Sequence, residues 1–346
     1  MLTLTSGASS LVVAPEYGAG ITGWMVGRTP ILRRALPQVS AEGDVHAMGC
    51  FPLLPYANRV GHARFAWHGR EYSLKRNFGD RPHSIHGLGW QRAWSVQQAT
   101  PRSIVLTLAH QPDASWPFAF DASIAYSLSG TALTVTMRLT NRHDSPAPAG
   151  LGLHPYFPRT HNPMLRFDAT GAWENDADSL PLRHDVPPED WRHVRPRSVA
   201  RSRLDNCFTG WSGKADILAG PISSRSHFAK AGGIFSGHDA DEDSGIERHN
   251  ENCCPASLRM EAGGAFRNLQ VFTPRGADFF CVEPVSHVPD ALNRAGLPPD
   301  QAMHVLRCGE TLDGTIRFSA AGDYRGHGAK IKTATPAHAA PLPNRR

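Results

Sequence analysis

The sequence has few cysteines and no long apolar run. Its 346 residues include only six cysteines, which are scattered from Cys50 to Cys308 and so do not predict a disulfide scaffold. No stretch reaches the roughly 18 apolar residues of a membrane-spanning helix. The N-terminus also lacks the basic and apolar segments of a signal peptide. We therefore expect reduced thiols, a cytoplasmic location and no membrane partner.

The formal net charge of +5 comes mostly from the C-terminus. Residues 322–346 contain five lysines or arginines and one acidic residue, whereas the rest of the chain is nearly neutral. Nucleic-acid-binding proteins usually carry a basic stripe or patch, often interleaved with aromatic residues. Because no such pattern occurs, we expect no nucleic-acid partner, and we interpret residues 321–346 as a disordered tail.

Glycine and proline are frequent, with 32 and 28 residues, and both favour turns between short strands. Alternation of apolar and polar residues predicts hairpins over 64–74, around His68-Gly69, and over 120–140, around Ser129-Gly130. Further strands are expected at 103–109, 215–218, 256–260, 268–273 and 315–319. No span of about 12 residues shows the pattern of an amphipathic helix, so the predicted fold class is all-β.

One segment differs from this pattern in composition. Residues 222–255 contain six acidic residues against three lysines or arginines and show little β pattern. Such a composition is typical of a long surface loop. We therefore expect one domain over residues 1–320, with an insertion or long loop at 222–255.

Glu283 follows an apolar run in the segment FFCVEPVSHVPDALN, residues 279–293. Proline cannot donate a ladder hydrogen bond, so Pro284 is expected to end the strand and leave the carboxylate at the rim of a sheet, facing a cleft. A general base belongs in such a place. The alternative is a solvated carboxylate, which is the usual state of a surface glutamate.

Three further segments combine polar side chains with turn residues. They are PYANR at 55–59, HSIHG at 83–87 and GLHPYF at 152–157. A lone histidine is more often structural than catalytic. However, His86 precedes a glycine, which allows a backbone or ligand to approach closely, and His154 precedes a proline. Both histidines are therefore candidates for a crowded site.

Together these segments resemble the aldose 1-epimerase, or galactose mutarotase, family. The resemblance includes Asp205 in the segment LDNCFTGW, and the motifs occur in the family's order between about residues 12 and 319. It implies a large antiparallel β-sandwich, the galactose mutarotase-like supersandwich, with a sugar cleft on one concave face. It further implies a small-molecule aldose as the substrate and no cofactor.

The resemblance also assigns roles to individual residues. Interconversion of α and β anomers requires a base that takes the proton from the C1 hydroxyl and an acid that protonates the ring oxygen. Glu283 would be the base and His154 the acid, with His86 as a second catalytic histidine. The residues that would bind the sugar hydroxyls are Asn58, Arg59 and Asp205.

This chemistry needs a particular charge state and an apolar contact surface. Glu283 must be ionised while His154 is protonated, and each charge would stabilise the other. Trp90, Phe208 or Trp211 could contact the apolar face of the sugar, although packing in a β core is the commoner role of such residues.

A metal site is a competing interpretation of the histidines. His83, His86 and the pair Cys253-Cys254 offer nitrogen and sulfur ligands. Zinc sites normally use cysteines spaced by two to four residues, which adjacent cysteines do not satisfy. We therefore expect no metal.

Two other functions would keep the same fold. A non-catalytic sugar-binding or sugar-sensing protein would need Arg59 and Asp205 but not the acid–base pair. A hexose-6-phosphate 1-epimerase would need extra cations for the phosphate, for which Arg76, Arg81 and Arg159 are candidates. The sequence does not indicate an oligomeric state.

Overall fold

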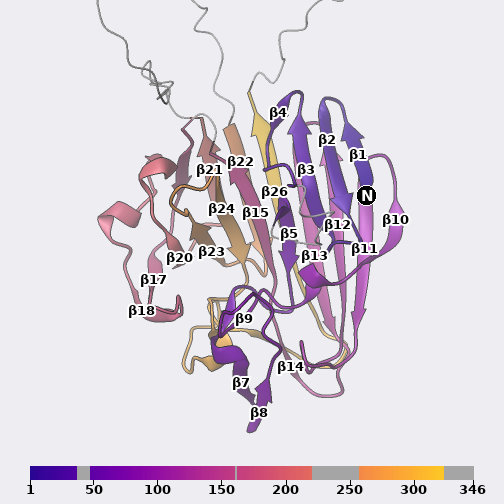
Figure 1. Ribbon diagram of the computed structural model, residues 1–346, viewed down its shortest axis with the longest axis vertical. Coiled ribbons are helices and arrows are strands. Elements are labelled where there is room, and N and C mark those ends of the chain that lie inside the picture. Colours follow the sequence, from indigo (N-terminus) through magenta and orange to yellow (C-terminus); the bar gives the residue numbers. More distant parts are fainter. Residues whose placement is uncertain (37–46, 160–161, 220–256, 323–346) are drawn as a thin grey trace, which may run out of the picture.

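The computed structural model describes residues 1–36, 47–159, 162–219 and 257–322. Within them, nearly all regular structure is β-strand, and two large antiparallel sheets lie against each other (Figure 1). The predicted all-β class and antiparallel sandwich are therefore confirmed. The expected insertion at 222–255 and the expected tail from residue 323 onward lie outside the described residues, and the last strand runs to Ala321.

The first sheet joins eleven strands of the described chain in the order β1-β2-β3-β5-β15-β24-β23-β20-β17-β18, with β4 paired to β3. Its strands are β1 (Leu2–Ser6), β2 (Ser9–Ala14), β3 (Gly20–Val26), β4 (Thr29–Pro30), β5 (Cys50–Leu53), β15 (Gly152–Pro158), β17 (Gly171–Asn175), β18 (Pro181–Asp185), β20 (Asp205–Thr209), β23 (Asn268–Phe272) and β24 (Phe279–Val285). Strands from distant parts of the sequence are thus neighbours at its centre.

The second sheet joins nine described strands: β10 (Ser95–Ala99), β11 (Ser103–His110), β12 (Phe120–Ser129), β13 (Ala132–Asn141), β26 (Thr311–Ala321), β22 (Ser257–Gly264), β21 (Lys214–Leu218), β16 (Met164–Phe167) and β19 (Arg197–Ser198). Three short pairs complete the described strands: β6 (Arg59–Val60) with β9 (Ser84–Ile85), β7 (Arg64–Trp67) with β8 (Arg70–Ser73), and β14 (Ala147–Ala149) with β25 (His304–Leu306). No helix in the described part of the chain is both long and apolar enough to span a membrane.

Alternating burial explains why these segments form strands. In β26, Ile316 and Phe318 face the interior, whereas Thr315 and Arg317, which alternate with them, face solvent. Inward-facing residues of both sheets form one apolar core, in which the ring of Phe318 lies 6.1 Å from that of Trp24 in the first sheet. Burial of each such large side chain contributes about 1.5–3 kcal/mol, which holds the two sheets together.

Both predicted hairpins are present. β7 and β8 meet at His68-Gly69 as expected, and β12 and β13 meet at Gly130-Thr131, one residue later than predicted. A second, smaller apolar cluster, which includes Phe51 and Tyr156, covers the face of the first sheet that points away from the main core. The candidate site lies on this outer face.

The strand that contains Glu283 does not end at Pro284, so that prediction was wrong. β24 continues to Val285, and Glu283 is only 2% exposed, in mid-strand between β15 and β23. The pairing of β15 with β24 is interrupted between Gly152 and Tyr156. A strand proline is tolerated there because its missing N–H has no ladder bond to make.

Candidate active site

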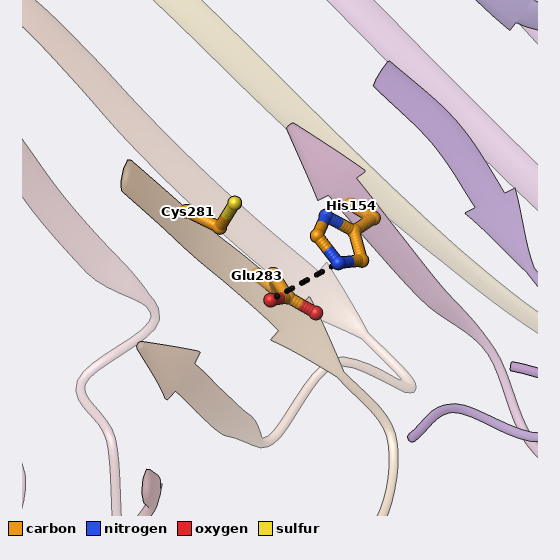
Figure 2. Close-up of side chains that lie close together, drawn as sticks. All are labelled: His154, Cys281 and Glu283. Carbon is orange, nitrogen blue, oxygen red and sulfur yellow. Dashed lines mark ion pairs between the residues drawn. The ribbon is translucent and has the colours of Figure 1, made fainter. Parts of the chain in front are cut away.

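His154 and Glu283 form a cross-strand pair at the centre of the first sheet (Figure 2). Gly152 of β15 pairs with Val285 of β24, and the same register resumes beyond the interruption, so His154 lies directly opposite Glu283. Residues opposite each other on antiparallel strands point to the same face. His154 Nε2 lies 3.6 Å from Glu283 Oε1, which is too long for a hydrogen bond but close enough for strong electrostatic coupling.

Neighbouring rings hold the imidazole of His154 in place. Phe51 lies opposite it on β5 and stacks on it with 4.9 Å between ring centroids, and Tyr156 stacks at 4.6 Å. His86 approaches the ring edge-on at 5.1 Å. Because close-packed rings leave little free volume, packing fixes the direction in which the imidazole faces Glu283.

The carboxyl group of Glu283 lies in a desolvated environment. Burial, reinforced by the negative charge of Asp205 and opposed by Arg59, raises the pKa of Glu283 well above its ordinary value of 4.5. Its Oε2 accepts no hydrogen bond from the described residues. Burial therefore opposes the ionised carboxylate that is expected from the sequence.

Asn58 and His86 are held by reciprocal contacts. The N–H of Asn58 donates to His86 Nδ1 at 3.1 Å, and the N–H of His86 donates to the carbonyl of Asn58 at 2.9 Å. Both residues have left-handed backbones, with φ of 59° and 61°, a conformation that is uncommon outside glycine and concentrates at functional sites. Since Nδ1 accepts a hydrogen bond, a neutral His86 carries its proton on Nε2.

The segments 55–59 and 83–87 are tied to each other and to the segment that follows β24. β6 pairs with β9. His287 Nε2 accepts the N–H of Ala57 at 3.1 Å, and His287 Nδ1 donates to the carbonyl of Val288 at 2.8 Å. Burial lowers the pKa of His287 to about 4, so its ring stays neutral. Three motifs that are separate in the sequence thus form one hydrogen-bonded unit.

A chain of polar side chains lies beside His154 and Glu283. Arg59 Nη2 lies 3.5 Å from Asp205 Oδ2, and Gln270 Nε2 donates to Asp205 Oδ1 at 2.9 Å. Asn58 Oδ1 accepts from Arg59 Nη1 at 3.2 Å. Gln270 is also opposite Glu283 in the register of β23 and β24. Gln270 therefore connects the predicted binding residues to the position of Glu283 in the sheet.

All six site residues predicted from the sequence line one pocket of about 280 Å³. This volume is near the lower end of the range for small-molecule sites and suits a single sugar ring. The same pocket is lined by the aromatic residues Phe78, Tyr156 and Phe272 and by the exposed Arg81. The structure thus brings the predicted residues together and adds aromatic surface to them.

Gln270 was not predicted from the sequence. It is buried in β23, and its Oε1 has no hydrogen-bond partner among the described residues. A signal for it existed, because Asn268 and Gln270 alternate with Leu269 and Val271. Such a period of two indicates a strand with one polar face.

None of the three aromatic residues considered from the sequence lines this pocket. Phe208 and Trp211 belong to the main core between the sheets. Trp90 packs against Phe51 with 6.0 Å between ring centroids. Packing is therefore their role, and Phe78, Tyr156 and Phe272 supply the aromatic surface instead.

His83 has structural partners on both ring nitrogens. Its Nδ1 accepts the N–H of His62 at 3.0 Å, and its Nε2 donates to the carbonyl of Asp178 at 3.2 Å. No nitrogen of this ring is then available for the metal site considered from the sequence. The cysteines of that hypothesis, Cys253 and Cys254, lie outside the described residues.

The three arginines considered for a phosphate differ in position. Arg81 lines the pocket, whereas Arg76 and Arg159 do not. Arg159 Nε donates to the carbonyl of Phe279 at 2.9 Å, which is a structural contact. Arg81 is therefore the member of the three that can reach a ligand.

The two packed antiparallel sheets, with the candidate pocket on the outer face of one of them, have the fold of galactose mutarotase-like proteins. Solved structures of this class match the chain. A candidate aldose 1-epimerase of Escherichia coli K12 superposes with a TM-score of 0.74 at 28% identity, over 92% of this chain and 98% of that one. A galactose mutarotase-like protein of Clostridium acetobutylicum gives a TM-score of 0.72 at 15% identity, over 92% and 94% of the two chains, which shows a likeness of fold alone.

The chain belongs to the aldose 1-epimerase family. The family model described as aldose 1-epimerase matches residues 1–319. The uncharacterized protein YphB of Escherichia coli K12 is 30% identical over 293 residues, which cover 84% of this chain and 90% of YphB. The resemblance drawn from the sequence motifs is therefore confirmed.

Proposed function

We propose that the protein is an aldose 1-epimerase that interconverts the α and β anomers of a free aldohexose such as galactose or glucose. The observation that carries this proposal is the cross-strand pair of His154 and Glu283, 3.6 Å apart in a pocket lined by hydroxyl-binding side chains. Membership of the aldose 1-epimerase family supports an isomerase that acts on a sugar.

In the proposed reaction, Glu283 takes the proton from the C1 hydroxyl while His154 gives a proton to the ring oxygen. The bond between C1 and the ring oxygen breaks, and the open-chain aldehyde forms. Rotation about C1–C2 presents the other face of the carbonyl, and the ring closes as both proton transfers reverse. Because both oxygens are bonded to C1, a base and an acid a few ångströms apart can reach them together.

The raised pKa of Glu283 fits this chemistry. The neutral pair and the charged pair of carboxylate and imidazolium contain the same number of protons. One state therefore converts into the other without net exchange of protons with solvent. A carboxylate whose pKa lies nearer to neutrality is also a stronger base at the moment it acts.

Substrate binding is assigned to the side chains around this pair. Asp205 offers carboxylate acceptors and Arg59 offers guanidinium donors, which suit hydroxyl groups that both accept and donate. Asn58 orients Arg59. The Nε2–H of a neutral His86 would donate to an oxygen near C1 and so support ring opening.

A hexose 6-phosphate is the second candidate substrate, because the exposed guanidinium of Arg81 lines the pocket. Arginine binds phosphate through paired hydrogen bonds. Arg81→Ala is then expected to weaken turnover of the phosphorylated sugar and to leave that of the free sugar unchanged. Equal effects on both substrates would remove this candidate.

Exchange NMR of the purified protein with galactose, glucose, xylose and arabinose tests the main proposal. We expect α/β exchange faster than in buffer for at least one sugar. Glu283→Gln and His154→Asn should each lower the enzymatic rate by about 10²–10⁴ while circular dichroism stays unchanged. A wild-type rate in the Gln variant would refute the mechanism, and saturable binding without acceleration would indicate a sugar-binding protein.

A further inference from the structure

Cys281 places a thiol beside the acid–base pair. It lies two residues before Glu283 on β24, so both side chains point to the same face of the sheet, and His154 faces them from β15 (Figure 2). One ligand atom from each of these three residues lies within 4.8 Å of the other two. All three side chains are buried.

The spacing of these atoms is close to that of ligands around a tetrahedral metal ion. Zinc bonds of about 2.0–2.3 Å place neighbouring ligand atoms roughly 3.3–3.8 Å apart. His154 Nε2 and Glu283 Oε1 already lie 3.6 Å apart. A movement of Cys281 Sγ by about 1 Å, which a small change of side-chain torsion supplies, brings the sulfur into the same coordination sphere.

The three ligand types select a particular kind of ion. Imidazole nitrogen and thiolate sulfur favour borderline or soft cations such as Zn²⁺ and Cd²⁺, whereas Mg²⁺ and Ca²⁺ prefer oxygen alone. A divalent ion with one thiolate and one carboxylate forms a site without net charge. Neutrality matters here because an uncompensated charge in a buried position is strongly unfavourable.

A metal ion can reach this position from the pocket. His154 and Glu283 both line the pocket, whereas Cys281 lies behind them with no exposed surface. Three protein ligands leave a fourth position for water or a sugar hydroxyl, as in zinc sites with an open position. Coordination requires the thiolate of Cys281, the carboxylate of Glu283 and a neutral His154. Binding therefore releases two protons to solvent, one from Cys281 and one from the pair of His154 and Glu283.

We propose that Zn²⁺ or Cd²⁺ binds to His154, Cys281 and Glu283 and inhibits the enzyme. The inhibition rests on the proposed function, because the metal occupies the lone pairs that would hold and transfer the protons of the reaction. In this role the ion is an inhibitor of the acid–base pair and takes no part in the chemistry.

Two measurements on the full-length protein, stripped of metal with EDTA and then desalted, test the proposal. The first is a titration with Cd²⁺, in which ultraviolet absorption reports cadmium–thiolate bonds and calorimetry gives the affinity. The second is the α/β exchange rate with increasing Zn²⁺. Cys281→Ala should retain basal activity. It should weaken metal binding and inhibition by more than about 10–100-fold, because even the loss of a residue that only orients a metal ligand typically costs that much affinity.

Cys207→Ala is the matched control, because Cys207 is also a buried cysteine of the outer-face cluster but lies outside the group of three. It should bind cadmium and respond to zinc as the wild type does. If Cys281→Ala does not fold, Cys281→Val, which fills the space of the thiol with apolar groups and offers no ligand atom, replaces it. Mg²⁺ at the same concentrations should leave the rate unchanged.

The outcomes separate this inference from the proposed function. A wild-type protein without cadmium–thiolate absorption, or an equal response in the Cys281 and Cys207 variants, would overturn the metal site whatever the activity. Activity that zinc does not lower would overturn the inhibition while epimerase function stands. Cadmium binding that is lost in Cys281→Ala, in a protein without epimerase activity, would support the metal site and refute the proposed function.

Discussion

Replacement of Glu283 by glutamine is expected to remove catalysis and to stabilise the fold at neutral pH. The amide has nearly the shape of the carboxyl group but cannot ionise. Burial and the charge of Asp205 raise the pKa of Glu283 well above 4.5. The folded protein therefore disfavours the ionised form relative to the unfolded chain, and this penalty disappears in the variant.

The sign of the pH dependence follows from the direction of this shift. Below about pH 4.5 the carboxyl group is protonated in both states, and the substitution has no ionisation effect. As the pH rises, the unfolded chain loses its proton first, so the wild type loses stability relative to the variant. The difference grows by at most about 1.4 kcal/mol per pH unit and levels off once the pH passes the pKa of the folded state.

Urea unfolding of both proteins between about pH 5 and about pH 8, with EDTA present, measures this difference. Glu261→Gln is the control for loss of a carboxylate on the surface, where the effect should stay within about 0.5 kcal/mol. A difference between wild type and Glu283→Gln that is constant over this range, or that falls as the pH rises, would refute the account of Glu283. The same variant should lose about 10²–10⁴ in α/β exchange rate.

Three further substitutions test the surroundings of the pair. Asp205→Asn should raise KM and move the acidic limb of the pH–rate profile to lower pH, because the charge of Asp205 raises the pKa of Glu283; an unmoved limb would contradict this. His287→Phe should lower the free energy of unfolding by about 1–3 kcal/mol, measured in urea, because both ring nitrogens make buried hydrogen bonds, and an unchanged midpoint would argue against it. Gly87→Ala should lower the free energy of unfolding by more than about 2 kcal/mol, because φ is +67° and an added Cβ would lie 2.1 Å from the carbonyl oxygen of Leu54. If the variant unfolded at the same temperature as the wild type, the expected clash would be disproved.

The site residues could be predicted because each lies in a short, recognisable segment. His86 precedes a glycine with positive φ, and Asn58 lies in a turn that also has a left-handed backbone. The positions of the strands could also be predicted from a local signal, because the alternation of apolar and polar residues within β12 or β26 is visible in the sequence. Neither signal depends on which strands pair.

The burial of Glu283 could not be predicted, because it depends on pairing between distant segments. Pro284 is a strand terminator by local rules. In the fold it faces the interrupted ladder between β15 and β24, where no N–H is needed, so the strand continues. The charges that act on Glu283 likewise come from other strands, Asp205 from β20 and Arg59 from β6.

The register of the first sheet determines the geometry of the pair of His154 and Glu283. Phe51, His154, Glu283, Gln270 and Cys207 follow one another across five adjacent strands as successive opposite residues. A slip of one residue in a strand would turn its side chain to the other face. In β15, β24 or β23 this would place His154, Glu283 or Gln270 in the apolar core. The free energy that fixes strand pairing therefore also fixes the distance between His154 and Glu283. Of the predicted binding residues, Asp205 lies on β20 of this sheet, whereas Asn58 and Arg59 belong to a short segment outside it. That segment can therefore change while the pair of His154 and Glu283 stays in place.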